Sequence, residues 1–525
     1  MVTLYNNGWI GDYLLSRSKI NGHGIAVYDA DNDTNYTYND LNDRANRLAN
    51  YLKYELGVEK GDRVAFISRN RIELIDGYYA TGKIGAIMIP YNARLSSEEL
   101  EKLINSETPK VVVYEDIYNE SITKIKDKLD VENYIILQNL DEDIYIDNLN
   151  YEEIMKYNNN PINCKDLDFE DIHLIIHTGG TTGLPKGGMI SHRAELFNSM
   201  NEICTWGLNY EDSAHIILPL FHTGGWNLLT LPLLHAGGKI IINKQFDPRQ
   251  TLDIIETEKT TVLFGAATIF RMMAELPEFK TADLSSLKWI MAGAAPTPIN
   301  IMEQFWDKGL KFVLGYGMTE AGPNNLSGAV QFMTDEEIKE KFASVGKPMY
   351  LTMTKVVDEN NNEVGVNEVG ELLWSGPQIF SGYWNNEEET NKTLIDGWVH
   401  TGDMAKVDED GYYYIVGRKK NMFISGGENV FPPEIEKYIY KIPEINEVCV
   451  FGVFDEVWGE VGKAVVSLKA NMQISKEEIQ EKLKQNLANY KVPKYITFVE
   501  DIPKNNVGKI VVGKIMELYG TSDDN

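Results

Sequence analysis

A loop rich in glycine and threonine is the part of this sequence best suited to hold an anion. Residues 177–188 read HTGGTTGLPKGG and follow the apolar run 174–176, which predicts a buried strand. Glycines let backbone N–H groups converge on one anion, threonine hydroxyls add donors, and Lys186 adds a positive charge. The spacing of the Walker A motif is absent. Taken alone, the stretch fits a phosphate-binding turn and an ordinary surface loop equally well.

The elements around this loop predict where it lies in the fold. Ser191 is suited to cap a helix, so strand, loop and helix are expected in that order. Further apolar runs at 216–218, 289–292 and 312–314 also lead into glycine-containing turns. Strands that alternate with helices predict an α/β domain with a largely parallel sheet. Because ligands of such sheets bind at the carboxyl ends of strands, we expect these turns to share one site.

The sequence changes character after about residue 343. Its strands become shorter, and Asp396-Gly397 and Asp410-Gly411 are typical turn dipeptides. A hairpin is expected at 424–430, followed by a small α+β unit. We therefore predict a large N-terminal α/β domain, residues 1–418, and a small C-terminal α+β domain, residues 419–525.

Composition narrows the class of protein. The 525 residues are 43% hydrophobic and 24% charged, as in ordinary soluble enzymes. A formal net charge of −28 without a basic stripe argues against nucleic acid as a partner. No apolar run is long enough for a membrane helix, and no secretory signal is visible, so a cytoplasmic location is expected. Cys164, Cys204 and Cys449 are too far apart to predict a disulfide framework or a zinc site.

Five motifs in a fixed order give the chain a family resemblance. The motifs are 178–187, Tyr-Gly-Met-Thr-Glu at 316–320, Thr-Gly-Asp at 401–403, Gly-Arg-Lys-Lys at 417–420, and the lysine-containing segment 503–509. The chain resembles the adenylate-forming superfamily of acyl-CoA synthetases, peptide-synthetase adenylation domains and firefly-type luciferases, from about Tyr36 to Lys509. The resemblance implies a large α/β domain and a small C-terminal domain that rotates between two half-reactions.

The reaction that the resemblance implies has two steps. A carboxylate attacks the α-phosphate of ATP to give an acyl-adenylate and pyrophosphate, and the thiol of CoA then displaces AMP. Cations and fixed N–H dipoles suit the first step, because charge gathers on the phosphoryl group. We therefore expect an ATP-dependent acid–CoA ligase. A stand-alone enzyme that passes its acyl group to a carrier protein's phosphopantetheine is the alternative, and a catalytically silent nucleotide-binding protein is a third hypothesis.

The resemblance also assigns residues to ATP. The phosphates would be held by Thr178, Gly179, Gly180, Thr181, Thr182, Gly183 and Lys186. The purine would lie against Gly293, Ala294, Ala295 and Tyr316, and Gly317 and Met318 would also belong to the ATP site. Thr319 would donate to the α-phosphate, and Glu320 would bind Mg²⁺, which prefers oxygen ligands. The two acceptor oxygens of Asp403 suit the ribose hydroxyls, and Arg418 would reach the ribose or phosphate.

The remaining assignments concern the acid and the thiol. Catalytic roles would fall to Lys509, Thr319 and His222, with His222 as a gate to the acid. The acyl pocket would be lined by His222, Trp226, Phe264, Gly265, Gly317, Met318 and Gly322, which predicts a hydrophobic fatty or aryl monocarboxylate. Lys420 would be the hinge, and Ser425, Gly426 and Gly427 would face CoA. The oligomeric state stays open, with a homodimer as one option.

Overall fold

The computed structural model describes residues 8–139, 149–178, 184–293, 297–504 and 510–523. The chain forms two compact units. Unit 1 comprises Met1–Met353 and Trp374–Val399, and unit 2 comprises Thr354–Leu373 and His400–Asn525. The predicted boundary between Arg418 and Lys419 concerns the point at which a small domain turns. The two compact units show how the folded chain packs, but they do not test where the small domain turns. The predicted boundary therefore stays a prediction.

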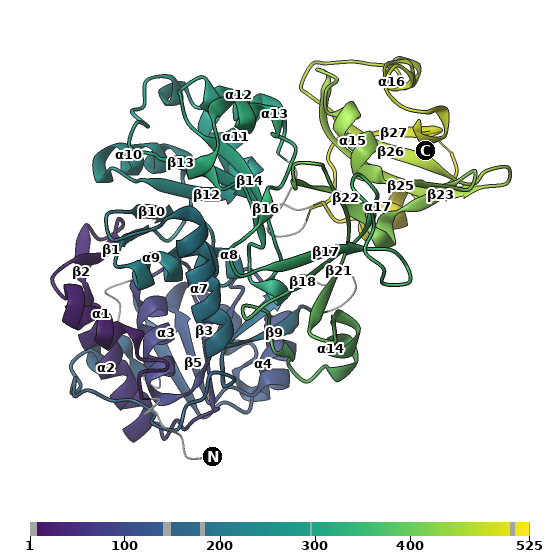
Figure 1. The fold of residues 1–525 in the computed structure, drawn as a ribbon. Coiled ribbons are helices and arrows are strands. Elements are labelled where there is room, and N and C mark those ends of the chain that lie inside the picture. The colour runs from purple at the N-terminus through teal and green to yellow at the C-terminus, as the bar shows by residue number, and fades with distance from the viewer. Residues whose placement is uncertain (1–7, 140–148, 179–183, 294–296, 505–509, 524–525) are drawn as a thin grey trace. The chain divides into compact units, whose positions relative to one another are not determined.

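Unit 1 contains a nine-stranded sheet in the order β16-β15-β14-β13-β12-β10-β11-β1-β2. Neighbouring strands of this sheet are parallel from β14 through β13, β12, β10 and β11 to β1, which confirms the predicted α/β class. Strands β12, β13 and β14 lie side by side in Figure 1. The bounds are β1 (Ile25–Asp29), β2 (Thr34–Thr37), β10 (Ser213–Ile216), β11 (Lys239–Ile242), β12 (Val262–Ala266), β13 (Trp289–Gly293), β14 (Phe312–Tyr316), β15 (Leu326–Ser327) and β16 (Lys347–Pro348).

A second sheet of unit 1 has eight strands in the order β19-β9-β8-β4-β3-β5-β6-β7. Its central strands are parallel, whereas β8 and β9 form an antiparallel pair and β19 joins β9 antiparallel. The bounds are β3 (Arg63–Ile67), β4 (Ile87–Tyr91), β5 (Val111–Glu115), β6 (Asn133–Leu137), β7 (Leu149–Asn150), β8 (Ile172–Thr178), β9 (Lys186–Ser191) and β19 (Gly382–Tyr383).

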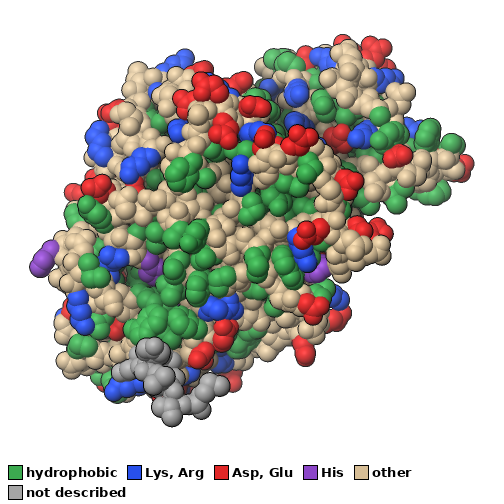
Figure 2. Space-filling view, viewed as in Figure 1, with side chains coloured by type: hydrophobic (Ala, Val, Ile, Leu, Met, Phe, Trp, Pro, Cys, Tyr) green, Lys and Arg blue, Asp and Glu red, His purple; other side chains and the backbone are tan. Residues whose placement is uncertain are grey.

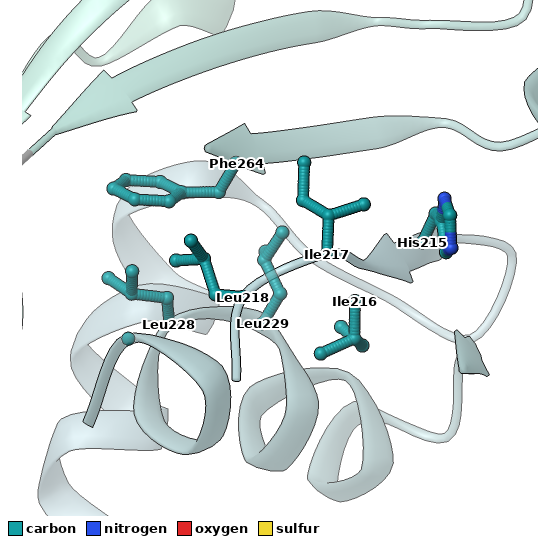
Figure 3. A pocket seen from close by; sticks show the side chains of 8 residues that line it. His215, Ile216, Ile217, Leu218, Leu228, Leu229 and Phe264 are labelled. Carbon is teal, nitrogen blue, oxygen red and sulfur yellow. The ribbon is translucent and has the colours of Figure 1, made fainter. Parts of the chain in front are cut away.

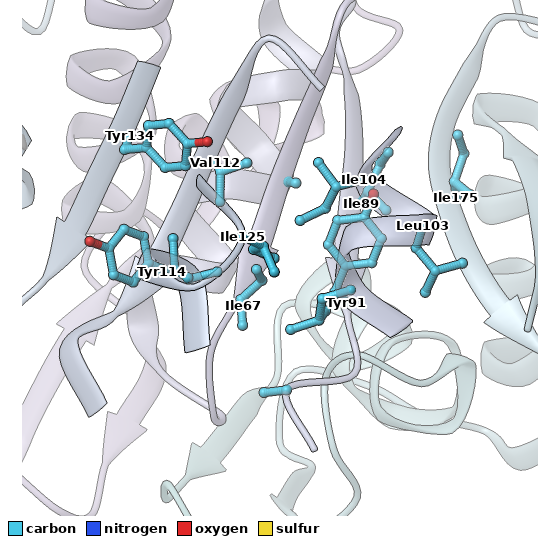
Figure 4. Close-up of a cluster of buried hydrophobic side chains, with 14 of the residues drawn as sticks. Ile67, Ile89, Tyr91, Leu103, Ile104, Val112, Tyr114, Ile125, Tyr134 and Ile175 are labelled. Atoms are coloured by element: carbon cyan, nitrogen blue, oxygen red, sulfur yellow. The ribbon is translucent and has the colours of Figure 1, made fainter. Parts of the chain in front are cut away.

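Helices cover these sheets with apolar faces. Helix α4 (Ser97–Glu107) begins at a capping box made by Ser96 and Glu99. It presents Leu100, Leu103 and Ile104 to strand residues in one buried cluster (Figure 4). The other helices of six or more residues in this unit are α1 (Tyr13–Asn21), α2 (Tyr38–Tyr54), α3 (Ile72–Ile84), α7 (His192–Trp206), α9 (Leu231–Ala236), α10 (Pro248–Glu258), α11 (Ala267–Ala274), α12 (Ile299–Trp306), α13 (Asp335–Glu340) and α14 (Glu387–Thr393).

Unit 2 begins with a sheet in which β17 (Met353–Val357) pairs with β18 (Gly370–Ser375), β18 with β21 (Trp398–Val407), and β21 with β22 (Tyr413–Arg418). The first two residues of β21, Trp398 and Val399, belong to unit 1 and pair there with short β20 (Leu394–Ile395). A second sheet has the order β24-β23-β26-β25, with β27 beside β26. Its bounds are β23 (Phe423–Ser425), β24 (Glu428–Val430), β25 (Ile445–Asp455), β26 (Gly459–Leu468) and β27 (Tyr495–Val499). Helices α15 (Pro432–Ile439) and α16 (Lys476–Lys484) share its core, and α17 (Val512–Tyr519) packs on β25.

Three expectations from composition can be compared with this structure. Within the described ranges, no helix is long and apolar enough to cross a membrane. Cys164, Cys204 and Cys449 are free. On the face shown in Figure 2, red acidic and blue basic side chains are interspersed, so this face carries no continuous basic stripe.

Candidate active site

The hairpin of β8 and β9 holds both ends of the glycine-rich loop. Thr178 is the last residue of β8, Lys186 is the first of β9, and the two residues are paired across the hairpin. The predicted anion-binding residues Gly179, Gly180, Thr181, Thr182 and Gly183 lie outside the described residues. Strand pairing between β8 and β9 therefore fixes the backbone position of Lys186.

The predicted order of strand, loop and helix is wrong in one respect. Strand β9 stands between the loop and helix α7, so the helix does not begin at the loop. Ser191 caps α7 as expected, since its side chain accepts a hydrogen bond from Ala194 N at 3.3 Å. The strand was missed because Gly187 and Gly188 have low strand propensity, and pairing with β8 and β19 overrides it.

Lys186 forms an ion pair with Glu389 of α14. Its ammonium nitrogen also lies 5.1 Å from the centroid of the Tyr383 ring. The hydrogen bond from Lys186 lowers the pKa of Glu389. Both side chains are about one third exposed, so solvent can reach the pair and another anion can compete for the lysine.

Glu320 is joined to the same group of side chains. It lies in the short 3₁₀ segment Thr319–Ala321 after β14, and its side chain is buried. Tyr383 donates a hydrogen bond to Glu320 Oε1 at 2.6 Å, and Phe380 N donates to the Glu320 carbonyl at 3.0 Å. Burial and the nearby Glu320 carboxylate raise the pKa of Tyr383, so the phenol stays protonated and remains a donor.

Strand β19 brings the two predicted motifs together. Tyr383 pairs with Gly188 of β9, and Trp384 N donates to the Gly187 carbonyl at 2.8 Å. A Cβ atom built on Gly188 would lie 3.6 Å from Cγ2 of Thr319, so the threonine packs directly against the loop hairpin. Lys186, Thr319 and Glu320, predicted separately, therefore form one cluster. Tyr383 and Glu389 were not predicted from the sequence, because their positions depend on a pairing between strands far apart in the chain.

A buried carboxylate supports the other side of the hairpin. Oε1 of Glu107, the last residue of α4, lies 2.8 Å from His177 Nε2 on β8. Its Oε2 accepts a hydrogen bond from the Tyr91 hydroxyl at 2.6 Å. A Cβ atom on Gly187 would lie 2.9 Å from Oε1, so a larger residue there would displace this carboxylate. Because His177 directly precedes Thr178, the pair fixes the strand from which the loop starts.

The residues predicted to contact the purine lie at the ends of neighbouring strands. Gly293 ends β13 and Tyr316 ends β14, while Ala294 and Ala295 are outside the described part of the chain. The Tyr316 ring packs at a centroid distance of 5.7 Å from Trp374. A Cβ atom on Gly317 would lie 2.3 Å from the Pro323 carbonyl oxygen, which explains a glycine there. Met318 follows Gly317 in extended conformation and caps the Thr319 segment.

A small pocket lies next to the predicted acid-binding motif. Its walls are formed by His215, Ile216, Ile217, Leu218, Gly224, Leu228, Leu229 and Phe264 (Figure 3). Phe264 is one of the predicted acyl-pocket residues, and Gly224 belongs to the motif of His222, whose Nδ1 accepts from Gly224 N at 3.2 Å. Gly265 adjoins the wall, since a Cβ atom there would lie 3.1 Å from Ile217 Cδ1.

The other predicted acyl-pocket residues have separate surroundings. Trp226 is fully buried and stacks on Tyr78 at a centroid distance of 5.3 Å. Gly322 has φ +81°, and a Cβ atom on it would lie 3.0 Å from Asn198 Oδ1. The roles predicted for these residues, and for Gly317 and Met318, stay predictions.

Asp403 and Arg418 form an ion pair in unit 2. They face each other across β21 and β22, and Arg418 Nε lies 2.6 Å from Asp403 Oδ1. Asp403 is almost completely buried, and its backbone N–H donates to Thr401 Oγ1 at 3.0 Å. Thr401 in turn donates to the Leu372 carbonyl at 2.6 Å. The Thr-Gly-Asp motif is thus a rigid strand feature with the carboxylate oriented by an arginine.

The predicted hinge and thiol-facing residues also lie in unit 2. Lys420 is in the 3₁₀ segment Lys419–Asn421 after β22. Gly426 and Gly427, with φ of +61° and +88°, form the turn of the β23–β24 hairpin after the buried Ser425. A Cβ atom on Gly427 would meet no atom within 4 Å. Lys509 lies outside the described residues.

Comparison with known proteins identifies the chain. The model of the AMP-binding enzyme family matches residues 17–384, and that of the AMP-binding enzyme C-terminal domain matches residues 434–509. The chain belongs to the AMP-binding enzyme family. The predicted family resemblance is thereby confirmed, and so is the expectation of a large N-terminal domain with a smaller C-terminal one.

Relatives of this enzyme cover nearly its whole length. It is 34% identical to a feruloyl-CoA synthase of Amycolatopsis sp, over 98% of this chain and 100% of the relative. It is 33% identical to a long-chain-fatty-acid–CoA ligase of Bacillus subtilis, over 92% of this chain and 90% of the relative. ATP-bound MatB from Rhodopseudomonas palustris superposes with a TM-score of 0.88 at 29% identity, over 98% of this chain and 99% of MatB. The enzyme is an ATP-dependent, AMP-forming acid–CoA ligase, as predicted.

Proposed function

We propose that this ligase takes a hydrophobic monocarboxylic acid, converts it to an acyl-adenylate with release of pyrophosphate, and then forms the acyl-CoA with release of AMP. The apolar residues beside the His222 motif support the proposal, because leucine, isoleucine and phenylalanine predominate among them. The described residues that line this pocket include no Lys or Arg, so among them a second carboxylate on the substrate would find no cation. The relatives, which are named for an aryl and a fatty substrate, are compatible with both kinds of acid.

The cluster around the loop hairpin supports the adenylation step. Lys186 lies at a strand end with an exchangeable anionic partner, so a phosphate group can replace Glu389. Thr319, packed on the hairpin, is suited to donate to the α-phosphate. These groups would hold the pyrophosphate in place while the carboxylate attacks, which lowers the entropic cost of reaction. Lys509 would then balance charge between the carboxylate and the α-phosphate.

Glu320 fits a magnesium ion by its chemistry. A buried carboxylate oriented by a tyrosine hydroxyl is the kind of hard oxygen ligand that Mg²⁺ prefers. When bound, the ion would neutralise phosphate charge. Asp403, oriented by Arg418, would accept hydrogen bonds from the ribose hydroxyls.

Purified full-length enzyme should release AMP only when ATP, Mg²⁺, CoA and a hydrophobic acid are all present. Fatty and aryl acids of graded size, with a dicarboxylate as control, would be compared by the rate of AMP release. Formation of the adenylate without release to free CoA would favour a carrier protein as acceptor. Absence of acid-dependent pyrophosphate exchange with every acid would overturn the proposal. The cytoplasmic location and the oligomeric state stay predictions from the sequence.

A further inference from the structure

Three buried side chains bring donor atoms for a metal ion together in the core of unit 1. His173 lies in β8, and His192 and Glu195 lie at the start of α7. One donor atom from each lies within 4.8 Å of the others, and no second group of this kind occurs within the described ranges. Each residue is at most 1% exposed. Because His192 and Glu195 are three positions apart in one helix, they share a face.

The hydrogen bonds of His173 leave one ring nitrogen directed at this group. Nε2 lies 2.9 Å from the Tyr78 carbonyl oxygen, which can only accept, so Nε2 carries a hydrogen. Nδ1 faces Glu195 Oε2 at 2.8 Å. In the neutral ring Nδ1 has a lone pair, so this contact joins two acceptors and needs a proton or a metal ion between them. Histidines that bind metals typically donate the other ring N–H to a carbonyl or carboxylate in this way.

Tyr78 also orients the carboxylate of Glu195. Its hydroxyl donates to Glu195 Oε2 at 2.9 Å. Burial and the charge of Glu195 raise the pKa of Tyr78, so the phenol stays protonated and remains a donor. Oε1 of Glu195 is buried and has no hydrogen-bond partner among the described residues. One residue of α3 thus holds two of the three side chains, and one carboxylate oxygen is left to bind a ligand.

His192 has the fewest interactions of the three. Neither of its ring nitrogens has a hydrogen-bond partner in the described part of the chain, although both are buried. Burial lowers the pKa of His192 well below its usual value, so the ring is neutral at pH 7 and keeps a lone pair. Its ring centroid lies 4.5 Å from that of His173, with 18° between the planes. Turning the ring about its Cβ–Cγ bond would break no hydrogen bond to a described residue, so His192 can offer a nitrogen to an ion.

We propose that His173 Nδ1, one ring nitrogen of His192 and the carboxylate of Glu195 bind a structural Zn²⁺ ion. A proton between His173 and Glu195 would satisfy that one contact only, whereas a metal ion would engage all three side chains. Imidazole nitrogens and carboxylate oxygens are ligands of zinc in proteins, and both oxygens of Glu195 would complete four donor atoms. The ion would join β8 to α7, the elements before and after β9. Because the site is buried, the ion would be taken up as the chain folds.

The zinc content of the full-length enzyme tests this proposal. Enzyme would be purified from cells grown with added Zn²⁺ or in zinc-depleted medium, and both samples would be dialysed against a chelator. We expect the first sample to keep about one zinc ion per chain and to melt about 3 °C or more above the second. X-ray absorption at the zinc edge should show imidazole ligands and distances of about 2.0–2.2 Å to nitrogen and oxygen. Zinc well below one ion per chain, or sulfur among its ligands, would overturn the proposal.

Two variants test the ligands themselves. His192→Phe keeps a ring and removes both nitrogens, and Glu195→Gln keeps an acceptor for Tyr78. Each should lower the retained zinc to about one tenth of an ion per chain or less. His23→Leu, at an exposed histidine, is the control and should keep about one ion. If one variant does not fold, the other and the zinc-edge spectrum of the wild type still decide. Wild-type zinc content in a folded His192→Phe or Glu195→Gln enzyme would overturn the assignment.

Discussion

The hydroxyl of Tyr383 donates a hydrogen bond of 2.6 Å to Oε1 of Glu320. Tyr383 lies in the strand that pairs with the loop hairpin, so this bond ties the carboxylate predicted to bind Mg²⁺ to the strand that begins at Lys186. The orientation of Glu320 is therefore set by a residue outside the five sequence motifs.

Tyr383→Phe should raise the Mg²⁺ concentration that the enzyme needs for half-maximal activity. Loss of the hydrogen bond frees the Glu320 side chain, and loss of such an orienting partner typically lowers metal affinity or activity by about 10- to 100-fold. Pyrophosphate exchange measured over a range of Mg²⁺ concentrations would show the midpoint move upward. Tyr350→Phe, at an exposed tyrosine, is the matched control. An unchanged midpoint would show that Tyr383 does not orient a metal ligand.

Lys509→Ala should separate the two half-reactions. We expect acid-dependent pyrophosphate exchange to fall by about 100-fold or more, because a positive charge that meets developing charge in the transition state is lost. Thioester formation from a supplied acyl-adenylate should continue at a rate close to that of the wild type. Lys514→Ala in α17 is a nearby control. Near-normal exchange in Lys509→Ala would contradict the catalytic role.

Gly427→Phe should slow the second half-reaction, thioester formation, and spare the first. Open space surrounds the missing Cβ of Gly427, so a bulky side chain would project from the hairpin where the pantetheine arm is predicted to pass. Adenylation should be spared, while thioester formation from acyl-adenylate falls by about 100-fold. Gly411→Phe is the control, since Gly411 has a similar φ of +80° and equally open surroundings. If both variants slow the second step alike, backbone strain and not a blocked path is the cause.

Glu107→Gln should destabilise the base of the loop hairpin. A glutamine offers one acceptor oxygen, so it cannot accept from both His177 and Tyr91. The free energy of unfolding should fall by about 1–3 kcal/mol, and the KM for ATP should rise because the strand that starts the loop is less well fixed. Urea denaturation and initial rates measure the two effects. Glu98→Gln on the exposed face of the same helix should change neither. A lower stability with an unchanged KM would rule out a role in ATP binding.

Stability should fall between about pH 4.5 and pH 7 because of Glu436. Burial raises the pKa of this carboxyl in α15 from 4.5 to about 7, although Val450 N donates to it at 2.8 Å. Between the two values the folded state holds a proton that the unfolded state releases, so rising pH favours unfolding. The loss is complete above the folded pKa and amounts to at most about 3 kcal/mol. Denaturation of Glu436→Gln should lack this loss, whereas Glu477→Gln should behave as wild type. Parallel pH profiles for wild type and Glu436→Gln would refute the assignment.

Local patterns in the sequence predicted much of the fold. The apolar run at 174–176 lies in β8, Ser191 caps α7, and the predicted hairpin at 424–430 is β23–β24 with its turn at Gly426 and Gly427. Each of these features depends on residues close together in the chain, where propensity and capping act. Strand β9 escaped prediction because its glycines form a strand only through pairing with neighbours.

The parts of the site that were missed depend on contacts between distant segments. Tyr383, Glu389 and Glu107 have no local sequence signal, since a glutamate in a helix is usually solvated and Tyr383 belongs to a strand of two residues. Their importance follows from strand order and helix packing, which place them beside Glu320, Lys186 and His177.

The ion pair between Lys186 and Glu389 changes how phosphate binding should be understood. Under the role proposed for Lys186, this lysine would not gain a partner when ATP arrives but would exchange one anion for another. The free energy of binding the pyrophosphate group at this lysine would then be the difference between the free energies of two ion pairs. Raising the salt concentration weakens both ion pairs. When pyrophosphate leaves, Glu389 would take its place, so under the proposed role of Lys186 the carboxylate that lowers the affinity for ATP would also speed the release of the product.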